Sequence, residues 1–150
     1  MRTILAAVVA LTVPLAVVPA TAASATPERK PACSLAKQPK FQKIIDVKPG
    51  GVGKARKKHP YGSLTGRYTK LTKGEFGDGY YKPVGKKKTR GFAKKAVICL
   101  IVPTDSGLAM RKVGLKSLRK AVDRPVMNPQ WGLQWNTKGR ITLAYQIYAP

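Results

Sequence analysis

The chain has 150 residues, of which 29 are Lys or Arg and only 6 are Asp or Glu, so its formal net charge is +23. This length is enough for a single domain with a modest hydrophobic core. So large a positive charge opposes compaction and attracts anionic partners, and so few carboxylates leave little material for acid–base or metal chemistry.

The N-terminal residues predict a secretory signal peptide over residues 1–25. After Arg2 the chain is uncharged as far as Pro27, and it contains an apolar stretch broken by Pro14 and then two Ala-x-Ala sites. An uncleaved membrane anchor is the alternative, because an uncharged stretch of this length just spans a bilayer. Pro14 and the small residues favour cleavage. We therefore expect a secreted, extracellular protein whose formal charge falls from +23 to +22 when Arg2 is removed.

The sequence contains two cysteines, Cys33 and Cys99. In an exported chain, two cysteines predict one disulfide bond rather than a redox or metal-binding pair. Closing so long a loop removes about 4 kcal/mol of conformational entropy from the unfolded chain in the loop-entropy model.

Residues 26–50 predict an N-terminal arm pinned by Cys33. Within it, Phe41–Val47 fits either a short strand or one helical turn, and the glycines that follow Pro49 interrupt any regular structure. A basic segment rich in glycine and aromatic residues then covers residues 51–95. From Lys54 to Lys95 it holds 14 Lys or Arg against two acids, Glu75 and Asp78.

This basic segment predicts binding to a polyanion. Glycine lets a backbone approach a ligand closely, aromatic rings stack, and Lys and Arg neutralise negative charge. A role for the aromatic residues in a small core is an equally good alternative. The polyanion-binding residues we predict are Arg56, Lys57, Lys58, Arg67, Lys70, Lys73, Lys86, Lys87, Lys88 and Arg90, with Tyr68, Tyr80 and Tyr81 as stacking partners.

Residues 96–150 predict an α+β core. Ala96–Val102 is an unbroken apolar run rich in β-branched residues, which predicts a strand buried on both faces. A turn at Thr104–Gly107 joins it to Leu108–Val113 in a hairpin. The next segment, Gly114–Asp123, places Leu115, Leu118 and Val122 at helical spacing.

A second predicted hairpin runs from Gly132 to Tyr148 around a turn at Asn136–Gly139. The resulting order of elements is ββαββ. We expect an α+β fold in which a small antiparallel sheet of two hairpins packs against one helix and is tied by one disulfide.

Catalytic signals are few. The single histidine, His59, lies among lysines and arginines and fits a surface position or a phosphate contact better than a catalytic base. Glu75 and Asp78 fit ion pairs with nearby lysines better than an acid–base pair, and Ser106 fits a turn. No set of His, Cys, Asp and Glu has metal-ligand spacing, so we expect no metal and no cofactor.

The composition therefore predicts non-enzymatic attachment to an anionic polymer or surface: a cell-wall polymer, a polysaccharide, or nucleic acid bound with low sequence specificity. One alternative is a small nuclease that uses His59, Glu75, Arg67 and Arg90. Another is a cationic antimicrobial protein or toxin. A third is an inhibitor or accessory protein of an acidic secreted enzyme, with Trp131 and Trp135 as contacts, although these tryptophans fit a core position better.

Overall fold

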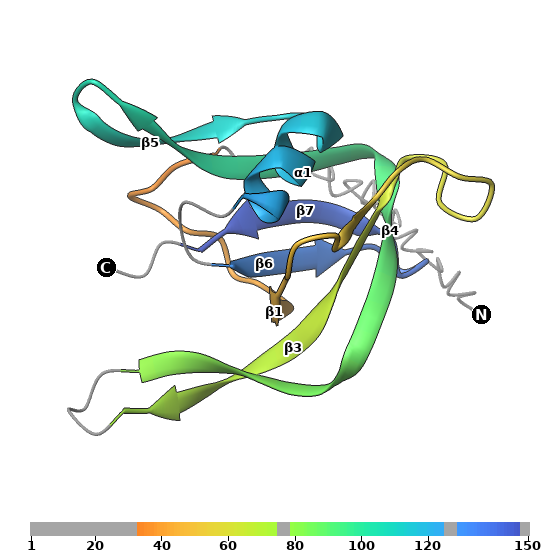
Figure 1. Ribbon diagram of the computed structural model, residues 1–150, viewed down its shortest axis with the longest axis horizontal. Coiled ribbons are helices and arrows are strands. Elements are labelled where there is room, and N and C mark those ends of the chain that lie inside the picture. The colour runs from red at the N-terminus through yellow and green to blue at the C-terminus, as the bar shows by residue number, and fades with distance from the viewer. Residues whose placement is uncertain (1–32, 75–78, 125–128, 148–150) are drawn as a thin grey trace, which may run out of the picture.

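The computed structural model describes residues 33–74, 79–124 and 129–147. The predicted signal peptide over residues 1–25 lies outside these ranges, as do Glu75, Asp78 and Tyr148. In the described residues, a strongly curved sheet surrounds a core, and a single short helix lies against it (Figure 1).

The described ranges contain seven strands and one helix. The strands are β1 (Lys43–Asp46), β2 (Val52–Gly53), β3 (Ser63–Lys73), β4 (Gly79–Thr104), β5 (Gly107–Lys112), β6 (Gln130–Trp135) and β7 (Ile141–Gln146); the helix is α1 (Leu115–Asp123). Both predicted hairpins, β4–β5 and β6–β7, are confirmed, and so is the helix between them. Phe41–Val47 contains a strand rather than a helical turn. No helix in the described ranges is long and apolar enough to cross a bilayer.

The sheet closes on itself. Its strand order is β2-β3-β1-β6-β7-β4-β5, and β3 also pairs with β4. The strands β1, β3, β4, β7 and β6 therefore form a ring, with β2 and β5 attached outside it. In this ring β4 and β7 run parallel, with Cys99 beside Tyr145, whereas the other described pairings are antiparallel.

The prediction of a small antiparallel sheet built from two hairpins is wrong. The hairpins belong to a mixed sheet, seven-stranded in the described residues, that also includes most of the basic segment. The difference arises from β4, whose first half pairs with β3 and whose second half pairs with β5 and β7. Between Lys86 and Lys95 this strand has almost no apolar alternation, so its extended conformation depends on backbone pairing that the side-chain pattern does not reveal.

The pairings of β4 contain two irregularities, one with β3 and one with β7. The register of β3 on β4 shifts between Gly66 and Tyr68, and that of β4 on β7 shifts between Phe92 and Val97. Such bulges bend a strand and increase its twist. Figure 1 shows the outcome: β4 curves from the projecting β3–β4 hairpin around to β5.

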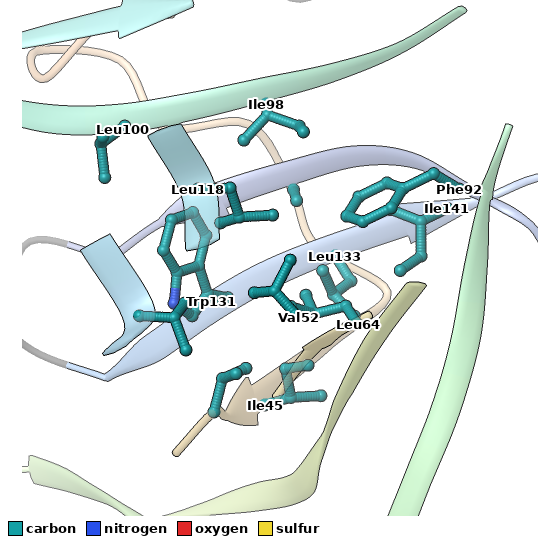
Figure 2. Packing of buried hydrophobic residues seen from close by; sticks show 13 residues of the cluster. Ile45, Val52, Leu64, Phe92, Ile98, Leu100, Leu118, Trp131, Leu133 and Ile141 are labelled. Carbon is teal, nitrogen blue, oxygen red and sulfur yellow. The ribbon is translucent and has the colours of Figure 1, made fainter. Parts of the chain in front are cut away.

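The apolar run Ala96–Val102 of β4 is buried on both faces, as predicted, most completely at residues 97–101. Ile98 and Leu100 belong to a large hydrophobic cluster, and Val97 and Cys99 belong to a smaller one on the opposite face. In the large cluster, Leu118 of α1 and Trp131 of β6 lie close together under β4 (Figure 2). Trp131 is only 1% exposed, so its core interpretation is confirmed and its role as a contact for a protein partner is wrong.

The predicted disulfide between Cys33 and Cys99 is confirmed, with a Cα–Cα distance of 5.4 Å. The bond joins the segment that precedes β1 to strand β4. The Phe41 ring also packs against Tyr145, with ring centroids 5.5 Å apart, and the Tyr145 hydroxyl donates a hydrogen bond to the Ser34 carbonyl. Residues 33–41 are thus fixed to the smaller cluster rather than being held by the disulfide alone.

Candidate anion-binding site

A hollow of about 390 Å³ lies where three separate segments meet. We call it the basic hollow. The loop between β2 and β3, the middle of β4 and the turn between β6 and β7 supply its lining, which consists of Lys58, His59, Lys88, Thr89, Arg90, Gly91, Lys138, Gly139 and Arg140. Five of these side chains carry a fixed positive charge and none is acidic. In Figure 1 the three segments converge on the side of the molecule where β4 bends.

The β2–β3 loop presents its cations on a tight turn. The backbone N–H of Arg56 donates to the His59 carbonyl at 3.1 Å, and the His59 N–H donates to the Arg56 carbonyl at 2.9 Å. This exchange leaves Lys57 and Lys58 as the two residues at the tip of the turn, where both are exposed. Lys58 lines the hollow, whereas Arg56 and Lys57 do not.

His59 packs directly on the backbone of β4. A Cβ atom placed on Gly91 would lie 2.5 Å from His59 Nδ1, so only glycine leaves room for the ring in this position. The backbone N–H of Phe92 donates to the Gly62 carbonyl at 3.0 Å and thereby fastens the end of the loop to β4. His59 is therefore held at the wall of the hollow by its neighbours on two elements.

Arg90 is the most tightly positioned cation of the hollow. Its Nε donates to the Tyr68 hydroxyl at 3.1 Å and its Nη1 to the Gly139 carbonyl at 3.2 Å. The guanidinium also stacks on the Trp135 ring, 4.1 Å from the centroid. Tyr68, which accepts the hydrogen bond from Arg90, also lies beneath Lys88: the Lys88 ammonium is 5.5 Å from the centroid of the Tyr68 ring. Contacts with two strands, β3 and β6, and with the β6–β7 turn thus fix the guanidinium before any ligand arrives.

The β6–β7 turn supplies the last two cations. The side-chain oxygen of Asn136 accepts hydrogen bonds from the backbone N–H groups of Lys138 and Arg140, both at 3.1 Å. Gly139 has a φ of +69°, a left-handed conformation that favours glycine. The asparagine and the glycine together hold Lys138 and Arg140 at the rim of the hollow.

The described acids lie elsewhere. Asp46 forms an ion pair with Lys48 at 3.5 Å, which is the ion pair found among the described residues. Asp123, at the end of α1, accepts a hydrogen bond from the Gly50 N–H at 2.8 Å, and Asp105 lies in the β4–β5 turn. Among the described residues, the cations of the hollow consequently repel one another without a neighbouring carboxylate, and an entering anion relieves that repulsion.

The structure gathers part of the predicted set in the hollow and spreads the rest. Arg67 and Lys87 line a separate hollow of about 130 Å³ that also contains Asp46 and Lys48. Farther along the β3–β4 hairpin, Lys70 lies opposite Lys82. Lys73 lies opposite Gly79 where the hairpin leaves the described residues, and Lys86 is exposed near the register shift.

The three predicted stacking tyrosines do not form one platform. Tyr68 pairs with Val84, Tyr80 with Thr72, and Tyr81 with Leu71. Because consecutive residues of a strand point to opposite faces, Tyr80 and Tyr81 lie on different sides of the hairpin. Tyr68 instead packs against the large core cluster and holds Arg90 with its hydroxyl.

The sequence did not identify Lys138, Arg140 or Trp135 as part of the same site. The turn residues were predicted, but the parallel pairing of β7 with β4, which brings that turn beside Arg90, was not. Of the predicted nuclease set, His59 and Arg90 meet in the basic hollow, Arg67 lies in the smaller hollow, and Glu75 lies outside the described residues. In the part of the chain described, no three His, Cys, Asp or Glu side chains are grouped so as to hold a metal ion.

No protein-family model, no curated protein and no solved structure matches this chain.

Proposed function

We propose that this protein attaches, without catalysis, to an anionic polymer, and that the basic hollow and the adjoining β3–β4 hairpin are its binding surface. The observation that carries the proposal is the lining of the hollow. Five lysine and arginine side chains from three segments, with no carboxylate among them, surround one space of about 390 Å³. A surface whose charges serve only solubility normally mixes both signs.

The arrangement of strands supports this proposal by analogy. A five-strand ring with one meander (β1, β3, β4), a helix after its third strand, and a parallel pairing of its third and fifth strands is the topology of the OB-fold. OB-folds bind oligonucleotides and oligosaccharides on the face of their second and third strands and with the loops that follow the first and fourth. Those elements correspond here to β3, β4, the β2–β3 loop and the β6–β7 turn. A fold hosts many functions, so this analogy adds weight only because the charged lining lies at the same place.

The binding we propose depends mainly on charge. Lysines outnumber arginines along the β3–β4 hairpin. A lysine ammonium acts as a point charge, whereas arginine can recognise the edge of a base through two parallel hydrogen bonds. Nucleic acids, sulfated polysaccharides and phosphate-containing polymers should all bind, with little discrimination by sequence.

The test is the salt dependence of binding. With about six polymer charges engaged, the logarithm of the affinity should fall against the logarithm of the salt concentration with a slope of roughly −4 to −5. Elution from a heparin column should require clearly more salt than a control protein of the same isoelectric point. Elution together with that control would contradict an organised binding surface.

The alternatives are less well supported. A hydrolytic role for His59 lacks a carboxylate partner among the described residues that line the hollow. A membrane-disrupting role calls for a long amphipathic helix, but α1 has nine residues and buries its apolar residues Leu118 and Val122 in the core. A role as an enzyme inhibitor loses Trp131 as a contact, since that side chain is buried.

A further inference from the structure

The basic hollow is more ordered than attraction to a diffuse polymer requires. Arg90 is held at Nε by Tyr68, at Nη1 by Gly139 and across its face by Trp135. Within the described residues the Nη2 nitrogen of Arg90 donates no hydrogen bond, so its N–H groups are available to a ligand. Fixing a guanidinium in advance reduces the entropy that binding would otherwise cost and favours a ligand of defined geometry.

The cations of the hollow also form a compact cluster around one open space rather than a stripe. Its volume lies at the small end of the range of about 300–1,000 Å³ that small-molecule pockets occupy. Lys58 and His59 approach from the loop, Lys88 and Arg90 from β4, and Arg140 from the turn. Such convergence suits a compact group that carries several negative charges in a small space.

We propose that the basic hollow is a specific site for a multiply charged phosphoryl group, either a terminal phosphomonoester or a condensed phosphate, on the polymer. This inference rests on the proposed function and specifies the chemistry of its site. A phosphomonoester carries about −1.5 to −2 charges at neutral pH and offers three acceptor oxygens. Those oxygens match donors that approach from three directions, with the guanidinium of Arg90 as the oriented one.

Singly charged groups fit the hollow less well. A sulfate ester or an internal phosphodiester brings one negative charge and leaves most of the five fixed positive charges unbalanced. These groups satisfy the long-range attraction of the β3–β4 hairpin equally well, because that attraction follows the summed charge. Discrimination between phosphoryl and sulfate groups should therefore reside in the hollow, whereas salt-dependent retention on polymers should involve the whole basic surface.

The test uses backbone amide and imidazole NMR signals of the isotope-labelled protein at constant ionic strength. Sodium pyrophosphate, glycerol phosphate and sodium methyl sulfate are titrated separately. We expect pyrophosphate or glycerol phosphate to shift the Gly91 and Gly139 amides and the His59 ring, with saturation. Methyl sulfate, a monoester with a single negative charge, should bind at least about tenfold more weakly, because it lacks the second charge. The tighter of the two phosphate ligands then identifies a condensed or a terminal phosphate as the preferred group.

Two variants of equal charge localise the effect. Arg140→Gln removes a cation from the hollow, and Arg111→Gln removes one from exposed β5. Only Arg140→Gln should weaken phosphate binding, by about tenfold for one lost charge-assisted contact. Equal loss in both variants, or methyl sulfate binding as tight as phosphate binding, would overturn the inference. If the same protein sample is still retained on the heparin column while neither phosphate ligand shifts the glycine amides, the specific site is refuted and the polymer attachment stands.

Discussion

The guanidinium of Arg90 lies 4.1 Å from the centroid of the Trp135 ring, so a cation of β4 covers an aromatic side chain of β6. The same guanidinium donates to Tyr68 on β3 and to Gly139 in the β6–β7 turn. This one side chain therefore links the strands that bend around the basic hollow to the turn that completes its rim.

The first prediction concerns Arg90→Lys. A lysine keeps the charge but cannot serve both the Tyr68 hydroxyl and the Gly139 carbonyl while it covers Trp135. We expect polyanion affinity to fall about tenfold, since an oriented donor is replaced by a flexible one. Arg111→Lys on β5 is the control and should bind like the parent. Equal affinities of the two variants in a fluorescence titration would show that the orientation of Arg90 contributes nothing.

The second prediction concerns Gly139→Ala. Gly139 has φ +69°, and a Cβ atom there would lie 3.1 Å from Nη1 of Arg90. Gly85→Ala is a matched control, because Gly85 has the same φ of +69° with no atom within 4 Å of its would-be Cβ. Both variants should lose about 1 kcal/mol of unfolding free energy in denaturant titrations through the left-handed conformation. Only Gly139→Ala should also weaken polyanion binding, and a binding loss in Gly85→Ala would argue against displacement of Arg90.

The third prediction concerns the disulfide. Cys33→Ala leaves Cys99 as a buried thiol, which packs like a small apolar side chain. Loss of the bridge should lower the free energy of unfolding by about 2–5 kcal/mol. A reducing agent should shift the denaturation midpoint of the parent protein in the same direction and leave the variant unaffected. An unchanged midpoint in Cys33→Ala would mean that packing of Phe41 and Tyr145 alone fixes this segment.

The fourth prediction concerns alkaline pH. Burial raises the pKa of Tyr145 above its ordinary value near 10, although the hydrogen bond to the Ser34 carbonyl partly opposes that rise. The unfolded chain then loses this proton at lower pH than the folded chain does, so the contribution to stability is fully present below pH 10 and is lost as the pH rises through the folded-state pKa. Comparison with Tyr145→Phe isolates the effect from lysine titration. The stability difference between the two proteins should change above pH 10, and a constant difference up to pH 11.5 or so would contradict the raised pKa.

The second half of the chain could be predicted from its side chains because burial there follows simple patterns. Ala96–Val102 is buried on both faces, and Leu118 and Val122 face the core at helical spacing. The first half of β4 gave no such signal. Its residues Lys86–Arg90 are exposed or half-buried, and their strand conformation comes from pairing with β3, which the composition does not encode.

The sequence predicts that the candidate site is basic, but it predicts only some of the residues that form it. Lys58, Lys88 and Arg90 were predicted from the charge of their segment, and they do share one hollow. Lys138 and Arg140 lie some fifty residues later in the chain, and only the parallel pairing of β7 with β4 brings them there. Local charge density predicts a basic surface, whereas the membership of a site depends on topology.

In the proposed attachment, the position of the charges, and not their sum, determines binding. Two double variants test it most directly: Lys138→Gln with Arg140→Gln in the hollow, and Arg111→Gln with Lys112→Gln on β5, each of which removes one lysine and one arginine. The measurement is the affinity for polyphosphate as a function of salt concentration. We expect the hollow variant to bind at least about tenfold more weakly, with a salt slope shallower by between one and two units, and the β5 variant to stay close to the parent. Equal affinities and equal slopes for the two variants would show that net charge alone attracts the polymer and would contradict the account.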